Sequence, residues 1–173
     1  MSMMKLRPYQ ASDSKYIIAW IADERSHFKW CLHHMAYPLT AEVMEAYENA
    51  FVDGRDGWLM TAVDENDVPV GHLSIQRKDG EEKTVRFNYI VVDDKRRKEG
   101  IGTEMLKEAV EYTFDTLGME RITLCVFENN QIAHNCYRSA GFSDIRHHER
   151  CIPYKDEIWS YYDMEQKKEL LGR

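Results

Sequence analysis

The sequence lacks any long apolar run, and its longest apolar stretches, such as Ile90-Val91-Val92, are far too short to cross a bilayer. Its first residues also lack the apolar segment of a secretion signal, because Arg7, Asp13 and Lys15 interrupt them. No internal repeat, low-complexity tract or linker rich in Gly, Ser or Pro divides the chain. We therefore expect one compact domain over residues 1–173, located in the cytoplasm and not in a membrane.

Cysteine is scarce and unpatterned: the four cysteines show no C-x-x-C spacing and no zinc-finger interval to histidine. We expect reduced thiols that serve as small apolar residues, namely Cys31, Cys125, Cys136 and Cys151. His147, His148 and Cys151 have no obvious fourth ligand nearby, so we expect no metal site. The net charge of −7 argues against nucleic acid as the main partner, because phosphate binding requires a positive field.

Hydrophobic periodicity is present along most of the chain and predicts a mixed α/β sheet, with antiparallel strands first and a β-α-β-α-β half after them. Strands are expected at Met4–Tyr9, Trp58–Val63, Pro69–Arg77, Thr84–Val92, Arg121–Phe127, Ser143–His148 and Trp159–Met164. Helices are expected after the caps Ser12 and Asp13 to about Asp23, from Thr40 to near Gly54, over Gly102–Leu117 and over Asn130–Ala140.

The turn between the strand that ends at Val92 and the helix that begins near Gly102 carries the clearest sign of chemistry. Gly100 and Gly102 allow a ligand to approach the backbone closely, and the first N–H groups of a helix have no partner within it. Together with the helix dipole they form an anion site, beside the basic run 95–98. A pyrophosphate cradle is therefore physically reasonable, although a plain strand-turn-helix has the same glycines.

Other phosphate-binding loops fit poorly. The sequence has no G-x-x-x-x-G-K-S/T, and Met105 occupies the place of the third glycine of the dinucleotide fingerprint.

Two motifs in order resemble the GNAT superfamily of N-acetyltransferases. The superfamily's Q/R-x-x-G-x-G/A at a helix start is matched by Arg97, Gly100 and Gly102. Its later N-x-x-A-x-x-x-Y-x-x-x-G-F is matched at Asn130, Ala133, Tyr137, Gly141 and Phe142. The close resemblance covers about Thr84–Phe142.

The resemblance implies a central mixed sheet of six to seven strands with an antiparallel first half and splayed parallel central strands, flanked by about four helices. It implies an acyltransferase that uses acetyl-CoA as cosubstrate and an amine-bearing acceptor, and it allows a homodimer. The implied cofactor-binding residues are Ile90, Val91 and Val92 for the pantetheine arm and thioester, Arg97, Lys98, Glu99, Gly100, Ile101, Gly102 and Thr103 for the pyrophosphate, Asn130 for the pantetheine arm, and Tyr137 near the sulfur.

Attack of an amine on a thioester builds negative charge on the carbonyl oxygen, which backbone N–H groups can stabilise. The leaving thiolate can be protonated by a phenol, and the resemblance assigns this role to Tyr137. For the base, the strand Arg86–Val92 offers no acid or histidine. Glu128 is the nearest carboxylate after the following strand, and deprotonation through water is the alternative. One branch of the superfamily, which acetylates N-terminal amines, carries a glutamate at the position of Cys125. We interpret Cys125 as a core residue.

Acceptor choice is expected from the segments that cover the acceptor site in the superfamily, about Glu24–Tyr37 and Arg150–Glu157 here. The sequence does not name the acceptor among small-molecule and peptide or protein N-terminal amines. A non-catalytic acyl-CoA sensor or interaction module of the same fold is the alternative function, since the strand carboxylate is missing. An unrelated nucleotide-binding α/β domain is a third possibility.

Overall fold

The computed structural model describes residues 4–51, 55–96 and 99–169. The strands are β1 (Lys5–Pro8), β2 (Gly57–Val63), β3 (Pro69–Lys78), β4 (Glu81–Val92), β5 (Arg121–Phe127), β6 (Ser143–Tyr154) and β7 (Glu157–Lys167). The α-helices are α1 (Ser14–Trp20), α2 (Glu24–Cys31), α3 (Ala41–Asn49), α4 (Ile101–Glu111) and α5 (Gln131–Ser139). Shorter turns are η1 (Ala11–Asp13), η2 (Asp94–Arg96) and the π-helical η3 (Tyr112–Thr116), which continues α4.

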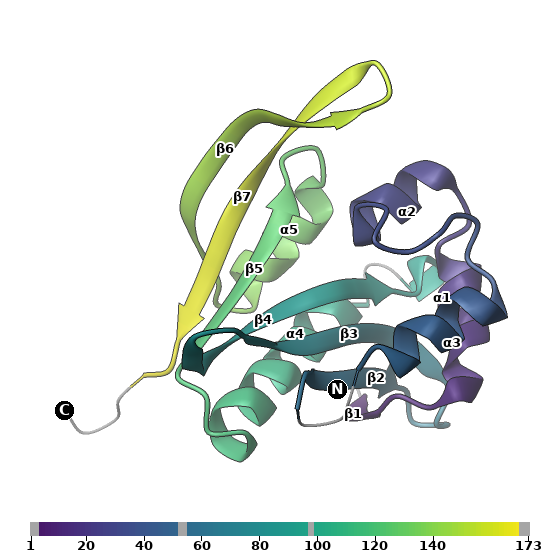
Figure 1. The fold of residues 1–173 in the computed structure, drawn as a ribbon. Helices are drawn as coiled ribbons and strands as arrows, with labels where there is room; N and C mark the ends of the chain where they lie inside the picture. Colours follow the sequence, from purple (N-terminus) through teal and green to yellow (C-terminus); the bar gives the residue numbers. More distant parts are fainter. Residues whose placement is uncertain (1–3, 52–54, 97–98, 170–173) are drawn as a thin grey trace.

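The strands form one sheet in the order β1-β2-β3-β4-β5-β7-β6. Every neighbouring pair is antiparallel except β4 and β5, which are parallel. The mixed sheet with an antiparallel first half and a parallel central pair is therefore confirmed. Figure 1 shows β6 and β7 as a long hairpin that rises beyond the rest of the sheet.

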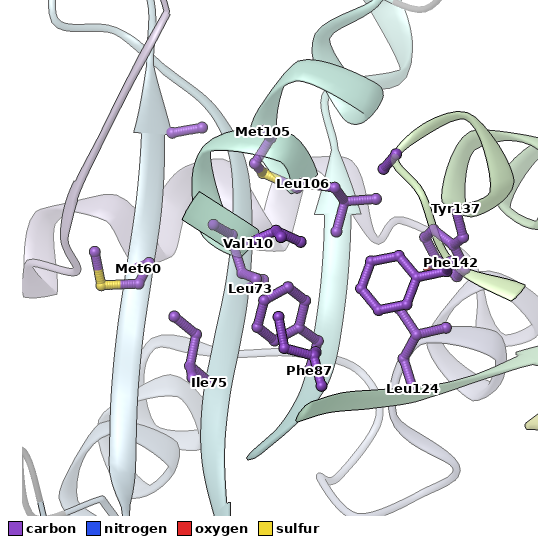
Figure 2. Close-up of a cluster of buried hydrophobic side chains, with 14 of the residues drawn as sticks. Met60, Leu73, Ile75, Phe87, Met105, Leu106, Val110, Leu124, Tyr137 and Phe142 are labelled. Atoms are coloured by element: carbon purple, nitrogen blue, oxygen red, sulfur yellow. The ribbon is translucent and has the colours of Figure 1, made fainter. Parts of the chain in front are cut away.

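Two layers of helices cover the two faces of the sheet (Figure 1). On one face, α4 and α5 bury the main core, in which Met105 and Leu106 pack over Leu73 and Phe87 (Figure 2). On the other face, α1, α2 and α3 form a second core that includes Ile17 and reaches the sheet at Leu59, Tyr89 and Val91. Successive strand residues point to opposite faces, so each central strand contributes to both cores.

The expected elements differ from the observed ones mainly at their ends and in one helix. The predicted helix of residues 102–117 is α4 followed by the π-helical η3, and the helix predicted from Thr40 ends at Asn49. The additional α-helix, which the sequence did not predict, is α2, and it lies in a segment that was expected to be a connection. Asp23 caps it by accepting a hydrogen bond from the Ser26 N–H at 2.8 Å.

Candidate active site

A β-bulge in β4 marks the centre of the site. Ser74 pairs with Asn88 and His72 pairs with Val91, so that Tyr89 and Ile90 together face Leu73. Tyr89 has a positive φ of 53°, which accommodates the extra residue. A bulge bends its strand and strengthens the local twist, so β4 changes direction at this point.

The bend separates β4 from β5. Their parallel pairing covers only Thr84–Arg121, Val85–Ile122 and Arg86–Thr123, and the two strands diverge beyond it (Figure 1). On its β5 side, the backbone of β4 after Arg86 therefore has no strand partner, and its polar groups can bind a ligand. The expectation of splayed central strands is confirmed.

A cleft of about 900 Å³ occupies the space between the diverging strands. It is lined by the end of β4, by the end of β5, by the first turns of α4 and α5, and by α1 and α2. Ile90, Val91 and Val92 are among its lining residues, as are Asn130 and Tyr137. The structure thus brings together most of the residues that the sequence assigned to coenzyme binding.

The first turn of α4 supplies the predicted anion site. Gly100 is the N-cap residue, with a left-handed φ of 76°, and the first helical hydrogen bond runs from the Glu104 N–H to its carbonyl at 3.0 Å. The N–H groups of Ile101, Gly102 and Thr103 precede that bond and have no acceptor within the helix. All four residues from Gly100 to Thr103 line the cleft.

Close packing holds that turn against its neighbours. A Cβ on Gly102 would lie 3.0 Å from the Cys136 sulfur and 3.6 Å from a Val92 methyl group. Thr103 Oγ1 lies 3.5 Å from the same sulfur. Glycine at position 102 therefore allows α4 to begin directly against α5 and the end of β4.

The structure describes Lys95 and Arg96 of the basic run before α4. Arg96 lines the cleft and pairs with Asp64 at 2.8 Å and with Glu99 at 3.2 Å. Glu99, a predicted cofactor-binding residue, thus contacts Arg96 and is not among the lining residues of the cleft. Arg97 and Lys98, which were also assigned to the pyrophosphate, lie outside the described residues.

Asn130 and Tyr137 approach the cleft from α5. The Asn130 side chain caps α5 by accepting a hydrogen bond from the Ala133 N–H at 3.4 Å. Tyr137 is 8% exposed, and its hydroxyl makes no hydrogen bond within the described chain. Burial, with a smaller contribution from Cys136, raises the pKa of the Tyr137 phenol, so the hydroxyl keeps its proton at neutral pH.

Glu128 does not reach the cleft. Its carboxylate lies 3.3 Å from Nε2 of His147 on β6, it is about half exposed, and it is not among the lining residues. No other carboxylate and no imidazole lines the cleft within the described ranges.

The interpretation of all four cysteines as small apolar residues is wrong for two of them. Cys151 is exposed, and Cys125 lines the cleft in a polar environment. An Arg86 guanidinium nitrogen lies 2.6 Å from the Cys125 sulfur, and the thiol donates to Asp163 at 2.9 Å. The sequence could not predict this hydrogen-bond network, because Arg86, Cys125 and Asp163 lie on three different strands.

The segments expected to cover the acceptor lie on the opposite side of the cleft from α4 and α5. Trp30 of α2 and Ile152 of β6 line the cleft. Phe28, Phe127, Tyr154 and Trp159 join α2 to β5 and the β6–β7 hairpin in a third apolar cluster. Ion pairs from Arg25 to Glu157 at 2.7 Å and from Lys155 to Glu24 at 3.0 Å connect the same elements.

The opening of the sheet at the bulge, with the N–H groups of the first turn of α4 facing into it, forms a cleft that suits an anionic coenzyme. The model of the Acetyltransferase (GNAT) family matches residues 12–142. The chain therefore belongs to the GNAT family, which is a family of acetyltransferases.

Known proteins resemble the chain at different levels. A Schizosaccharomyces pombe protein, UPF0039 protein C11D3.02c, is 30% identical over an alignment of 91 residues, and the match covers 46% of this chain and 59% of that protein. The chain thus spans less than two thirds of the length of this curated relative.

Two solved structures are similar in fold at low identity. Spermidine N-acetyltransferase from Vibrio cholerae, in complex with CoA and spermine, has a TM-score of 0.81 at 16% identity, covering 95% of each chain. An acetyltransferase of the GNAT family from Bacillus anthracis has a TM-score of 0.79 at 18% identity, covering 96% of each chain. None of the α-helices in the described ranges is long and apolar enough to cross a membrane.

Proposed function

We propose that the protein transfers the acetyl group of acetyl-CoA to a primary amine by direct attack in a ternary complex. The observation that carries the proposal is the single cleft that joins the first turn of α4, on one face of the sheet, to α1 and α2 on the other. A coenzyme and an acceptor can enter such a cleft from opposite faces and meet between β4 and β5.

In this proposal, the backbone of Ile90, Val91 and Val92 binds the pantetheine arm and the thioester oxygen, since β5 does not pair with it. The N–H groups of Ile101, Gly102 and Thr103 bind the pyrophosphate, together with the segment from Arg97 to Gly100. Asn130 contacts the pantetheine arm from the start of α5.

Tyr137 is proposed to donate the proton that the leaving thiolate requires. Its hydroxyl is protonated, lines the cleft and has no competing hydrogen bond in the described part of the chain. Burial makes the Tyr137 phenol a weaker acid, but it also disfavours a thiolate in the same place, so the proton affinity of the leaving sulfur rises together with the phenol pKa.

For deprotonation of the amine, the position of Glu128 outside the cleft favours water over this carboxylate. The energetic demand depends on the acceptor: a free alkylammonium costs roughly 4–5 kcal/mol to deprotonate at pH 7, whereas an α-amine costs about 1 kcal/mol. Water is sufficient for an acceptor whose ammonium group is not strongly basic.

The test is steady-state kinetics of CoA release with varied acetyl-CoA and amine concentrations. A ternary complex gives intersecting double-reciprocal plots, whereas parallel plots would indicate a covalent acetyl-enzyme and contradict direct transfer. Mass spectrometry of the acetylated amine identifies the product.

A second candidate function, an acyl-CoA sensor without turnover, is favoured by the lack of any carboxylate or imidazole on the described cleft lining. Binding of acetyl-CoA without CoA release for any amine would support it.

A cytoplasmic location and a homodimer are also part of the function that we propose. Size-exclusion chromatography with light scattering tests the dimer.

A further inference from the structure

The charged side chains on the described cleft lining are all cationic, and one of them, Arg96, is paired with Asp64 and Glu99 outside that lining. They are Lys29, Arg86 and Arg96, and no described lining residue is Asp or Glu. Arg96 lies before α4, on the coenzyme side.

Lys29 of α2 and Arg86 of β4 lie toward the acceptor side, since Arg86 shares its sheet face with Cys125 and Asn88. An acceptor with several positive charges would meet repulsion there.

Arg86 makes no direct ion pair in the described ranges, and the carboxylate it does influence is Asp163, which lies beyond Cys125 and whose pKa Arg86 helps to lower. The Arg86 Nε donates to the Asn88 side-chain oxygen at 3.3 Å, and its Nη2 lies 2.6 Å from the Cys125 sulfur. Asp163 is itself bound by His148 at 2.6 Å. A guanidinium that is partly withdrawn from water favours an anion as a partner.

Helix α2 adds two hydrogen-bond donors on the other wall. Lys29 reaches across to the carbonyl of Asn129 at 3.4 Å. Trp30 lines the cleft at 9% exposure, and its indole N–H is buried without an acceptor in the described structure. A buried donor without an acceptor is costly unless a ligand or water supplies an oxygen.

Resting on the proposed acetyl transfer, we infer that the acceptor is a small amine that carries an anionic group, as an amino acid does, and that Arg86 binds this group. The positive charges of Lys29 and Arg86 lower the pKa of the acceptor's ammonium group, because a like charge disfavours its protonated form. This effect helps deprotonation in a cleft that has no carboxylate base on its described lining. Such an acceptor differs from the spermine found with the Vibrio cholerae enzyme.

The third apolar cluster favours a small acceptor over a polypeptide. Phe28, Phe127, Tyr154 and Trp159 are each at most 8% exposed and fill the contact between α2 and the β6–β7 hairpin. Arg25 and Glu157 bridge the same contact with two hydrogen bonds at 2.7 and 3.1 Å. An extended chain would have to break this contact to pass between the two elements.

The test compares matched acceptors: amino acids, their amides, the corresponding decarboxylated amines, spermidine and a short peptide. CoA release should show kcat/KM for amino acids above that for their amides and decarboxylated amines by about tenfold or more, since a charged hydrogen bond is lost in each. Preference for spermidine or for the peptide would overturn the inference while leaving the proposed function intact. If acetyl-CoA binds and no amine is acetylated, the proposed function fails and the inference with it.

Variants identify the residue. Arg86→Gln should reduce the preference for the anionic acceptor by about tenfold without weakening acetyl-CoA binding, and Arg86→Lys should retain part of it. Lys83→Gln, a charge change on the exposed part of the same strand, should leave the preference unchanged. If Arg86→Gln keeps the full preference and the wild-type thermal stability, the anion binds elsewhere and the assignment to Arg86 is overturned.

Discussion

The Cys125 thiol donates a hydrogen bond to the Asp163 carboxylate, with 2.9 Å between sulfur and oxygen, because the two residues are paired directly across the neighbouring strands β5 and β7. Burial and this acceptor together raise the pKa of Cys125 to about 12, and the nearby Arg86 only partly opposes them. A cysteine that lines the active site is thereby held in its neutral form.

We predict that Cys125 resists alkylation at pH 8, because the thiolate is the reactive form and is scarce when the pKa is so high. The exposed Cys151 should be modified first by iodoacetamide. Peptide mapping by mass spectrometry after timed alkylation measures both rates. Equal rates at the two cysteines would contradict the assignment of a neutral Cys125.

Gly100 provides a test of the pyrophosphate cradle. Its φ of 76° costs a substituted residue about 1–2 kcal/mol, but an added Cβ would meet nothing within 4 Å. We predict that Gly100→Trp abolishes acetyl-CoA binding, since the indole blocks the approach to the first N–H groups of α4. Isothermal titration calorimetry measures this loss.

Gly118 supplies the matched control, because its φ of 71° and its open surroundings are similar and it is not among the residues lining the cleft. Gly118→Trp should unfold at a similarly lowered temperature and still bind acetyl-CoA. Wild-type affinity in Gly100→Trp would mean that the diphosphate binds elsewhere.

Tyr137→Phe tests the proton donor. We expect kcat to fall by about a hundredfold, the usual contribution of a general acid, while the Kd for acetyl-CoA stays the same. Thermal stability should change little, because the hydroxyl makes no hydrogen bond in the described chain. Tyr112→Phe, outside the cleft lining, is the control. Unchanged kcat in Tyr137→Phe would remove the general-acid role.

The sequence predicted the elements whose pattern is local. Strand β5 was predicted with the observed bounds Arg121–Phe127, because alternation of Ile122, Leu124 and Val126 is a strong period-two signal. The first turn of α4 was recognisable from Gly100 and Gly102. Helix α2 was missed although Asp23 stands as a cap before it, because its segment was read as an aromatic-rich connection over the acceptor.

Features that depend on tertiary structure could not be predicted in the same way. The bulge at Tyr89 shifts the register of two strands and has no signal in a continuous apolar run. Strand β6 is mostly exposed, so its length beyond His148 left no apolar alternation to detect. The contact between Arg86 and Cys125 joins residues of two parallel strands far apart in the chain, and only the sheet brings them together.

His72 gives a prediction on pH, because it is fully buried in β3 beneath the helices α1 and α3 and bonds the Tyr47 hydroxyl at 2.9 Å. Burial lowers its pKa to about 3, whereas an unfolded chain has the ordinary value near 6.5. Between these values the unfolded state binds more protons than the folded state. The contribution of His72 to the free energy of unfolding is therefore fully present above about pH 6.5 and is lost as the pH drops toward 3. Urea denaturation at pH 7.5 and pH 5 should show this loss.

In His72→Gln the loss of stability at low pH should be smaller. His147→Gln, at a partly exposed position on β6, should keep the wild-type dependence of stability on pH. A pH dependence in His72→Gln as steep as in the wild type would assign the effect to other groups, such as the buried His27.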